Sequence, residues 1–180
     1  MRPNNWISPV GAVLLTFGIV APTPAADADR GAGSGHESWG TPLVISAADF
    51  RNNGNDREAF YFSPNGYLTG EGSIVLMIAP VYLPNDATVQ TLAAHVYDNS
   101  MSCANPNITL WLNRVGAGTG TGMENMASVS TSGATSSMQT ISTSSVSHPV
   151  VDNLRYTYYA AVMMCSNSHE LHSVVIDYQE

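Results

Sequence analysis

Residues 91–98 read TLAAHVYD and residues 107–115 read NITLWLNRV, and in both runs apolar side chains alternate with others. The apolar positions of the two runs are Leu92, Ala94, Val96, Ile108, Leu110 and Leu112. A period of two is the pattern of a β-strand with one buried face. The two runs therefore predict strands whose remaining side chains point outward.

The same pattern recurs along the chain after Thr41. Further strand candidates are PLVIS at 42–46, EAFYF at 58–62, SIVLMIAPV at 73–81, MASVS at 126–130, MQTIST at 138–143, YTYYAAVMMC at 156–165 and HSVVIDY at 172–178. Turn sequences rich in Gly, Pro, Asn and Asp separate them, and no stretch presents a convincing helical face. About eight or nine short strands without helices predict an all-β fold, a single antiparallel β-sandwich of jelly-roll type.

The tyrosine-rich run alternates less cleanly than the first two. Its inward set is predicted to be Tyr156, Tyr158, Ala160, Val162 and Met164. Its outward set is predicted to be Thr157, Tyr159, Ala161 and Met163. In the last run, Val174, Ile176 and Tyr178 are expected to face the core.

Composition limits the class of partner. The chain has 180 residues, of which 44% are hydrophobic and 11% charged, and its formal net charge is −8. This length and apolar content suffice for one domain with a sizeable core. The chain has no lysine, and its few arginines are scattered. Because nucleic-acid binding needs clustered basic side chains, no nucleic-acid partner is expected.

The N-terminal region has the pattern of an export signal. One early arginine precedes an apolar run at 10–20, and APTPAADA at 21–28 places small residues where a signal peptidase cleaves. We expect a secretory signal peptide at 1–25, a flexible lead-in at 26–40 and the β-sandwich domain at 41–180. The apolar run is shorter than the about 20 residues that span a bilayer, although an uncleaved anchor is the alternative. The protein is therefore predicted to be secreted or at the cell surface, with no membrane span after signal removal.

Cys103 and Cys165 are the two cysteines of the chain. In an exported domain an even pair is most simply one disulfide, and neither cysteine has the C-x-x-C spacing of a zinc or redox site. The bond would close a loop of about 60 residues, for which chain entropy gives at most about 4 kcal/mol. The sequence therefore predicts a disulfide-stapled domain.

The stretch VGAGTGTGMENMASVSTSG at 115–133 has the glycine density of a phosphate-binding loop. Its glycine spacing does not match G-x-G-x-x-G, the chain has no P-loop lysine, and the segment runs from strand to strand. We therefore expect no nucleotide. The stretch is predicted to be the tip of a hairpin, after which Ala127 and Val129 restart the alternation.

Two segments invite a metal interpretation. HELH at 169–172 is close to the zinc motif H-E-x-x-H, but its histidines are three apart, so we expect a surface loop with two solvated histidines. DFRNNG at 49–54 has the glycine of an EF-hand loop without the closing glutamate. A looser calcium site at Asn53, Asn55 and Asp56 is left open beside a plain turn. No metal or other cofactor is predicted.

No residue is predicted to be catalytic. The Ser/Thr-rich stretch SVSTSGATSS at 128–137 contains no G-x-S-x-G nucleophile elbow, and no motif places a serine, a histidine and a carboxylate together. The paired carboxylates of a glycosidase could lie anywhere on a sandwich, so sequence cannot test for them.

An outward aromatic face is the remaining candidate site. If the strands at 88–98 and 107–115 are neighbours, their outward side chains share one surface. The predicted ligand-binding residues are His95, Tyr97, Trp111 and Asn113. Aromatic side chains with polar neighbours can hold a sugar ring or a partner's side chain, although they also serve simply to pack strands. Arg114 follows in sequence, but its parity places it on the inner face.

Three segments together resemble a domain family of exported bacterial proteins. They are APVYLPNDATVQTLAAHVYDNS at 79–100, MASVSTSGATSS at 126–137 and VVDNLRYTYYAAV at 150–162. In that family an APV-x-LP-x-x-A-x-V segment leads into a strand ending YDN, and a later VDN precedes a tyrosine-rich strand. The resemblance covers residues 42–179 and implies a β-sandwich without an established activity. Many members lack the cysteines, so the disulfide is a departure from the family pattern.

The predicted function is a non-catalytic extracellular or cell-surface interaction or structural module. A carbohydrate-binding module that uses the outward aromatic face is one alternative, and a small secreted hydrolase is another. The expected partner is an extracellular glycan or a protein, with no nucleic acid and no nucleotide, and self-association into an oligomer is left open.

Overall fold

The computed structural model describes residues 42–53, 60–70, 74–99, 107–118, 122–165 and 168–180. Within them eleven strands form two sheets, and one short 3₁₀ turn, η1 (Ala47–Asp49), follows the first strand. The six-stranded sheet contains β1 (Leu43–Ser46), β3 (Phe60–Phe62), β4 (Leu68–Gly70), β6 (Thr88–Asp98), β9 (Met138–Thr143) and β11 (His169–Gln179). The five-stranded sheet contains β2 (Arg51–Asn52), β5 (Val75–Val81), β7 (Thr109–Gly116), β8 (Met123–Ser130) and β10 (Tyr156–Met164). The predicted all-β sandwich is confirmed.

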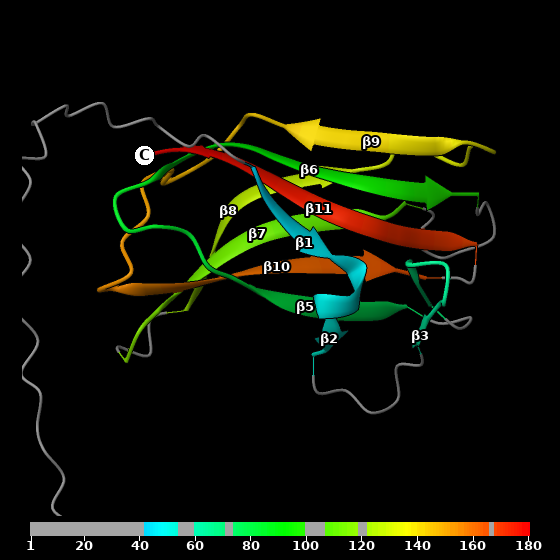
Figure 1. The fold of residues 1–180 in the computed structure, drawn as a ribbon, viewed down its shortest axis with the longest axis horizontal. Coiled ribbons are helices and arrows are strands. Elements are labelled where there is room, and N and C mark those ends of the chain that lie inside the picture. Colours follow the sequence, from blue (N-terminus) through cyan, green and yellow to red (C-terminus); the bar gives the residue numbers. More distant parts are fainter. Residues whose placement is uncertain (1–41, 54–59, 71–73, 100–106, 119–121, 166–167) are drawn as a thin grey trace, which may run out of the picture. The chain divides into compact units, whose positions relative to one another are not determined.

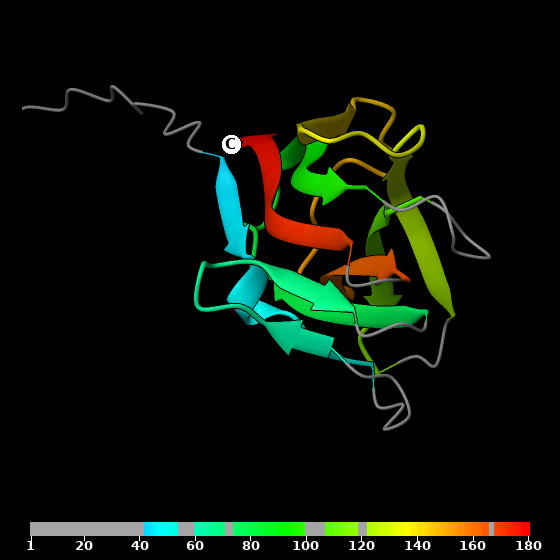
Figure 2. The same ribbon diagram turned by 90° about the vertical axis from the view of Figure 1, so that its right-hand side faces the viewer.

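The order of the strands decides which residues can meet. The six-stranded sheet has the order β3-β4-β11-β6-β9 with β1 also paired to β11, and the five-stranded sheet has the order β2-β5-β10-β7-β8. All of these pairings are antiparallel. Figure 1 shows β9, β6 and β11 toward one side and β10, β5 and β2 toward the other. Figure 2, turned by 90°, shows β1 in cyan beside β11 in red. Strands β6 and β7, consecutive in the chain, therefore lie in different sheets.

The hydrophobic core lies between the two sheets, on the faces that the alternation predicts. The core side chains of β6, β7 and β10 are Val89, Leu92, Ala94, Val96, Leu110, Leu112, Tyr158, Ala160, Val162 and Met164. Val174 and Ile176 of β11 are also buried, and Tyr178 packs against the core while half-buried. Burying a large aliphatic side chain stabilises the fold by about 1.5–3 kcal/mol relative to leaving it exposed. The strand register that turns these apolar positions inward is therefore favoured over a register shifted by one residue.

Nine of the eleven described strands coincide with predicted runs, and β2 and β4 do not. These two strands have two and three residues, too few to show an alternation. They are defined by their partners, since β2 pairs with β5 and β4 pairs with β11. Strand β8 begins at Met123, three residues before the predicted run at 126–130. The strand content of the fold is therefore larger than the predicted eight or nine.

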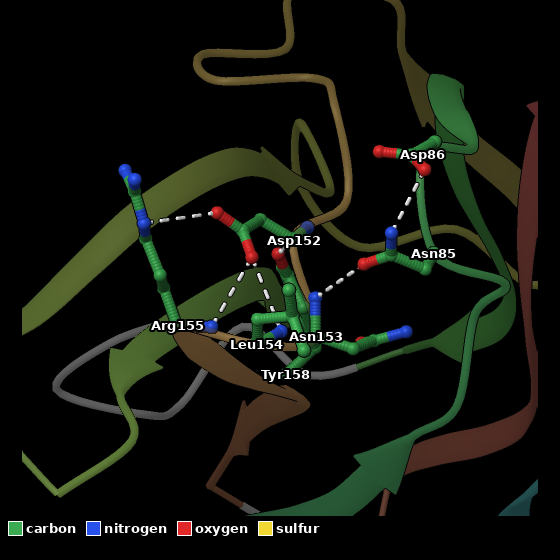
Figure 3. A network of polar contacts seen from close by, with 7 residues as sticks. All are labelled: Asn85, Asp86, Asp152, Asn153, Leu154, Arg155 and Tyr158. Atoms are coloured by element: carbon green, nitrogen blue, oxygen red, sulfur yellow. Dashed lines mark hydrogen bonds and ion pairs between the residues drawn. The ribbon is translucent and has the colours of Figure 1, made fainter.

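Two segments that are distant in the sequence, residues 83–86 and 151–153, are joined by hydrogen bonds beside β10, as Figure 3 shows. The Asn153 N–H donates to Asn85 Oδ1 at 2.9 Å, and the Asn153 side chain donates to the Leu83 carbonyl at 2.9 Å. The Asp152 N–H donates to the Tyr158 hydroxyl at 2.7 Å. Leu83 and Asn85 belong to the LPND motif, and Asp152 and Asn153 belong to the VDN motif, on which the family resemblance rests. The motifs therefore act by building the fold around the start of β10.

A second polar cluster is buried at the ends of several strands. Asp98 and His169 are both fully buried, with His169 Nε2 3.1 Å from Asp98 Oδ1. The other Asp98 carboxylate oxygen accepts from the Thr131 hydroxyl, whose oxygen accepts from the Ile108 N–H at 3.0 Å. His169 Nδ1 accepts from the Cys165 N–H at 3.2 Å. The cluster joins β6 and β11 of one sheet to residues that flank β7, β8 and β10 of the other.

The predicted surface loop at HELH is wrong. The segment opens strand β11, and His169 is fully buried. Only His172 and Glu170 are partly exposed, and they pair at 3.0 Å. A histidine is tolerated in the interior when its ring nitrogens have partners, which the sequence alone does not reveal. Within the described part of the chain, no group of at least three His, Cys, Asp or Glu side chains is arranged to hold a metal ion.

Several sequence predictions lie outside the described residues. These are the signal peptide at 1–25, the lead-in at 26–40, Cys103, and the Asn55 and Asp56 of the open calcium site. Cys165 is buried next to the end of β10, and its pairing with Cys103 stays a prediction. The described segments include no helix that is long and apolar enough to cross a membrane.

Candidate functional site

The outer face of the five-stranded sheet is hollowed into a cavity of about 480 Å³, which we call the sheet groove. Its lining residues are Asn53, Leu76, Ile78, Trp111, Asn113, Met123, Asn125, Tyr159, Ala161 and Met163. They come from β5, β7, β8 and β10 and from the residue after β2. Because neighbouring strands are about 4.8 Å apart, the sheet groove crosses about 19 Å from edge to edge of the sheet. Its volume is typical of a small-molecule site.

The centre of the sheet groove is deep because a small side chain occupies the middle strand. Ala161 of β10 lies opposite Ile78 of β5 and Trp111 of β7 in the antiparallel register. Tyr159 and Met163 lie two residues away along β10 and therefore point to the same face. Ala161 forms the floor, and four larger side chains surround it.

A β-bulge brings two residues of β8 to the sheet groove. The register of β7 and β8 shifts immediately before Asn113, which pairs with Asn125. Met126 is the extra residue, and its side chain is buried. The shift sets Asn125 and Met123 on the groove side of the sheet. Strands β7 and β8 on either side of the glycines therefore pair antiparallel, as the predicted hairpin requires, and β8 supplies part of the site.

Three polar side chains form a linked row at one end of the sheet groove. Asn125 Nδ2 donates to Asn113 Oδ1 at 3.1 Å and to the Ala127 carbonyl at 3.2 Å. The Asn113 side chain also hydrogen-bonds to the Tyr159 hydroxyl. Because this hydrogen bond lowers the pKa of Tyr159, it favours the phenolate, so the Asn113 amide group is the donor to the Tyr159 oxygen. The hydroxyl of Tyr159 therefore keeps its own hydrogen for an acceptor on a ligand.

Burial raises the pKa of Tyr159 above its ordinary value, and the hydrogen bond from Asn113 lowers the pKa by a smaller amount. Desolvation has this direction because the phenolate loses more hydration than the phenol does. Tyr159 is therefore a neutral hydroxyl, able to donate a hydrogen bond, throughout the physiological pH range.

We expect Tyr159 to ionise later than a free tyrosine when the pH is raised. In the unfolded chain it ionises at the ordinary pKa, so its contribution to the free energy of unfolding is complete below that pH and is lost as the pH rises toward the raised value. The phenolate ultraviolet absorbance of the folded protein, minus that of Tyr159→Phe, measures this titration. A difference curve with its midpoint at or below the ordinary tyrosine pKa contradicts the prediction.

The structure separates the four predicted ligand-binding residues into two pairs. Trp111 and Asn113 lie on β7 and line the sheet groove. His95 and Tyr97 lie on β6, in the other sheet, where His95 Nδ1 is 3.0 Å from Thr140 Oγ1. The predicted shared face is therefore corrected, because the chain crosses to the second sheet between β6 and β7. Both runs have the same period of two, which does not say to which sheet a strand belongs.

Sequence reasoning missed Tyr159 and Asn125 as site residues. Tyr159 did fall on the predicted outward face of its strand, together with Ala161 and Met163. The missing information was that β10 lies between β5 and β7. Asn125 lay outside the predicted run of its strand, and the bulge that turns it toward Asn113 has no marker in the sequence.

The described charged side chains near the sheet groove lie outside its lining and contact other parts of the domain. Arg114 is buried on the inner-face parity that the sequence predicted, with Nη2 2.6 Å from Glu124 Oε2. Its guanidinium also lies 4.1 Å from the centre of the Tyr156 ring. The Arg51 guanidinium, beside the other edge, donates to the Phe50 carbonyl at 2.8 Å. The lining that the structure describes is therefore uncharged.

The sequence matches no protein-family model and no curated protein. Solved structures with a similar fold include the CBM22-1–GH10 modules of endo-1,4-beta-D-xylanase 10B from Clostridium thermocellum, complexed with xylohexaose. That match has 12% identity, covers 76% of this chain and 27% of that chain, and has a TM-score of 0.50.

Two smaller proteins match at similar levels. A family 6 carbohydrate-binding module has 13% identity over 75% of this chain and 92% of its own, with a TM-score of 0.47. CsCBM6-3 from Clostridium stercorarium, in complex with cellobiose, has 15% identity over 75% of this chain and 92% of its own, with a TM-score of 0.45. At these identities the likeness concerns the fold alone.

Proposed function

We propose that this chain is a non-catalytic binding module whose sheet groove holds a glycan. One observation carries the proposal: Trp111 and Tyr159 line the same groove as the hydrogen-bonded row of Asn113 and Asn125. An aromatic ring packs against the apolar face of a sugar ring, and amide and hydroxyl groups exchange hydrogen bonds with sugar hydroxyls. The sheet groove offers both kinds of contact on one face.

The chemistry of the lining supports binding over hydrolysis. Glycoside cleavage by the common mechanisms requires two carboxyl groups that flank the scissile bond. The ten described lining residues include no Asp, Glu, His or Cys. The xylanase modules of similar fold were solved with xylohexaose, which agrees with a glycan ligand, but the proposal depends on the residues of the groove.

An extracellular setting completes the proposal. The predicted signal peptide at 1–25 would deliver the domain to the outside of the cell, where polymeric glycans occur, and a disulfide between Cys103 and Cys165 would be stable there. The second cysteine follows β10, the strand that carries Ala161 and Tyr159, so the bond would anchor one end of the strand at the centre of the groove.

A protein partner is the second candidate. It is favoured by the apolar part of the lining, where Leu76, Ile78 and Met163 could receive an apolar side chain. A glycan would also need the hydrogen-bonded row of Asn113, Asn125 and Tyr159. Loss of binding in each of the single variants Asn113→Ala and Trp111→Ala therefore points to a glycan, whereas dependence on the apolar residues alone points to a protein.

Trp111→Ala is expected to weaken binding to the glycan that the protein recognises by at least about tenfold, equal to about 1.4 kcal/mol. The reason is that the indole is the largest side chain of the described lining. Retardation of the full-length protein in native gels that contain soluble polysaccharides measures the effect.

Tyr97→Ala is the matched control, because it removes an outward aromatic side chain from the other sheet. We expect its retardation to equal that of the unmodified protein. The proposal fails if no polysaccharide retards the unmodified protein, or if Tyr97→Ala abolishes retardation and Trp111→Ala does not.

A further inference from the structure

We infer that the sheet groove selects uncharged glycans and discriminates against glycans that carry carboxylate or sulfate groups. The inference rests on the proposed function and names the ligand class of the same site. The evidence is that the described lining of the groove carries no charged side chain, and that its polar side chains are three asparagines and Tyr159.

An anionic sugar would find no compensating charge among the described lining residues of the sheet groove. Six of the ten lining side chains are apolar, and the other four are three asparagines and Tyr159. Moving a carboxylate or sulfate from water to such a surface removes hydration that amide dipoles only partly replace. A hydroxyl group has a much smaller desolvation penalty, and one or two hydrogen bonds offset it.

Among the described residues, the two arginines near the groove lie outside its lining. Arg114 on β7 is buried with Glu124 and covers the Tyr156 ring, on the face of the sheet opposite to the groove. Arg51 on β2 donates to the backbone carbonyls of Ala48 and Phe50. Recruiting Arg114 to a ligand would break its hydrogen-bonded pair with Glu124 and its contact with the Tyr156 ring. Neither guanidinium is therefore part of the described lining of the groove.

The charge of the whole chain acts in the same direction. The formal net charge of −8, without any lysine, gives a field that repels polyanions as they approach. At the groove itself Tyr159 presents a hydroxyl hydrogen, and Asn125, whose amide nitrogen already donates twice, presents its carbonyl oxygen. The Tyr159 hydroxyl matches a hydroxyl or ether oxygen of a neutral sugar, and the Asn125 oxygen accepts from a sugar hydroxyl. Long-range and local interactions thus favour the same ligand class.

Pairs of polymers that share a backbone and differ in charge test the inference. Suitable pairs are hydroxyethylcellulose with carboxymethylcellulose, guar galactomannan with carboxymethyl guar, and dextran with dextran sulfate. In native gels we expect the full-length protein to bind the neutral member of at least one pair, at least about tenfold more tightly than the charged member. We also expect that binding to persist at high NaCl, because no ion pair with the ligand is screened.

Met123→Lys adds a charge where the ligand is expected to lie. Met123 is 61% exposed at the rim of the groove. The new cation should increase affinity for the charged member of the bound pair, and added NaCl should remove that gain. Met138→Lys is the matched control, since Met138 is 51% exposed on β9 of the other sheet. We expect no comparable gain from it.

The outcomes separate the two proposals. If the unmodified protein prefers a charged polymer and Trp111→Ala abolishes that binding, the sheet groove binds glycans but the ligand class is wrong. An equal gain in Met123→Lys and Met138→Lys also overturns the ligand class, because the effect then comes from net charge alone. If the protein binds none of the polymers, the proposed function and the inference both fail.

Discussion

Asp98→Ala is expected to lower the free energy of unfolding by about 3–5 kcal/mol, equivalent to about 10–15 °C in melting temperature for a domain of this size. Asp98 is fully buried, and its carboxylate accepts from the Thr131 hydroxyl and lies 3.1 Å from His169 Nε2. The Cys165 N–H donates to His169 Nδ1, so in the neutral ring the hydrogen is on Nε2, the ring nitrogen that lies 3.1 Å from Asp98 Oδ1. Alanine removes the carboxylate from beside the buried Thr131 hydroxyl and the buried His169 ring.

This loss is a large fraction of the total free energy of unfolding of a domain, which is about 5–15 kcal/mol. Urea unfolding measures it, and Asp177→Ala is the matched control because Asp177 is exposed on β11. We expect the control to change stability by less than about 0.5 kcal/mol. In the double variant Asp98→Ala with His169→Ala, the loss should be smaller than the sum of the single losses, because both substitutions remove the same contact between Asp98 and His169. Equal midpoints for Asp98→Ala and Asp177→Ala contradict the prediction.

Alternation in the sequence predicts most of the core but not its polar exceptions. Leu92, Ala94 and Val96 are buried as the period of two requires. Asp98 continues the same face and is buried too, although its charge argues for solvent. It stays inside because Thr131 and His169, distant in the sequence, are brought to it by the fold. A period describes one strand, whereas a buried charge depends on partners from several strands.

The candidate site shows the same division between local and long-range information. The sequence predicts that Trp111 and Asn113 point outward, and that Tyr159 does so on its own strand. It does not predict that β10 lies beside β7, which sets Tyr159 directly opposite Asn113. The predicted partners His95 and Tyr97 are wrong, because β6 and β7 are neighbours in the chain but lie in different sheets. Strand parity is a local property, but strand order results from packing two sheets together.

Ala161→Trp is expected to abolish glycan binding while leaving the fold intact. Ala161 forms the floor of the sheet groove between Ile78 and Trp111. An indole at this position fills the space that a sugar ring would occupy, and the cavity of about 480 Å³ has room for it. The side chain points away from the core, so the core is not overpacked. Retardation in polysaccharide gels and the urea midpoint measure the two parts of the prediction.

Two further alanines make the test specific to the groove. Ala93→Trp places the same bulk on the outer face of the other sheet, where Ala93 pairs with Ser142 and Val175. We expect this variant to bind as the unmodified protein does. Ala160 is adjacent to Ala161 but belongs to the hydrophobic core cluster, which Ala161 does not, so Ala160→Trp should destabilise the domain by about 1–3 kcal/mol or more through overpacking. If Ala161→Trp keeps both its fold and its glycan binding, the ligand lies elsewhere on the molecule, because a groove whose floor is filled cannot hold a sugar ring against Trp111.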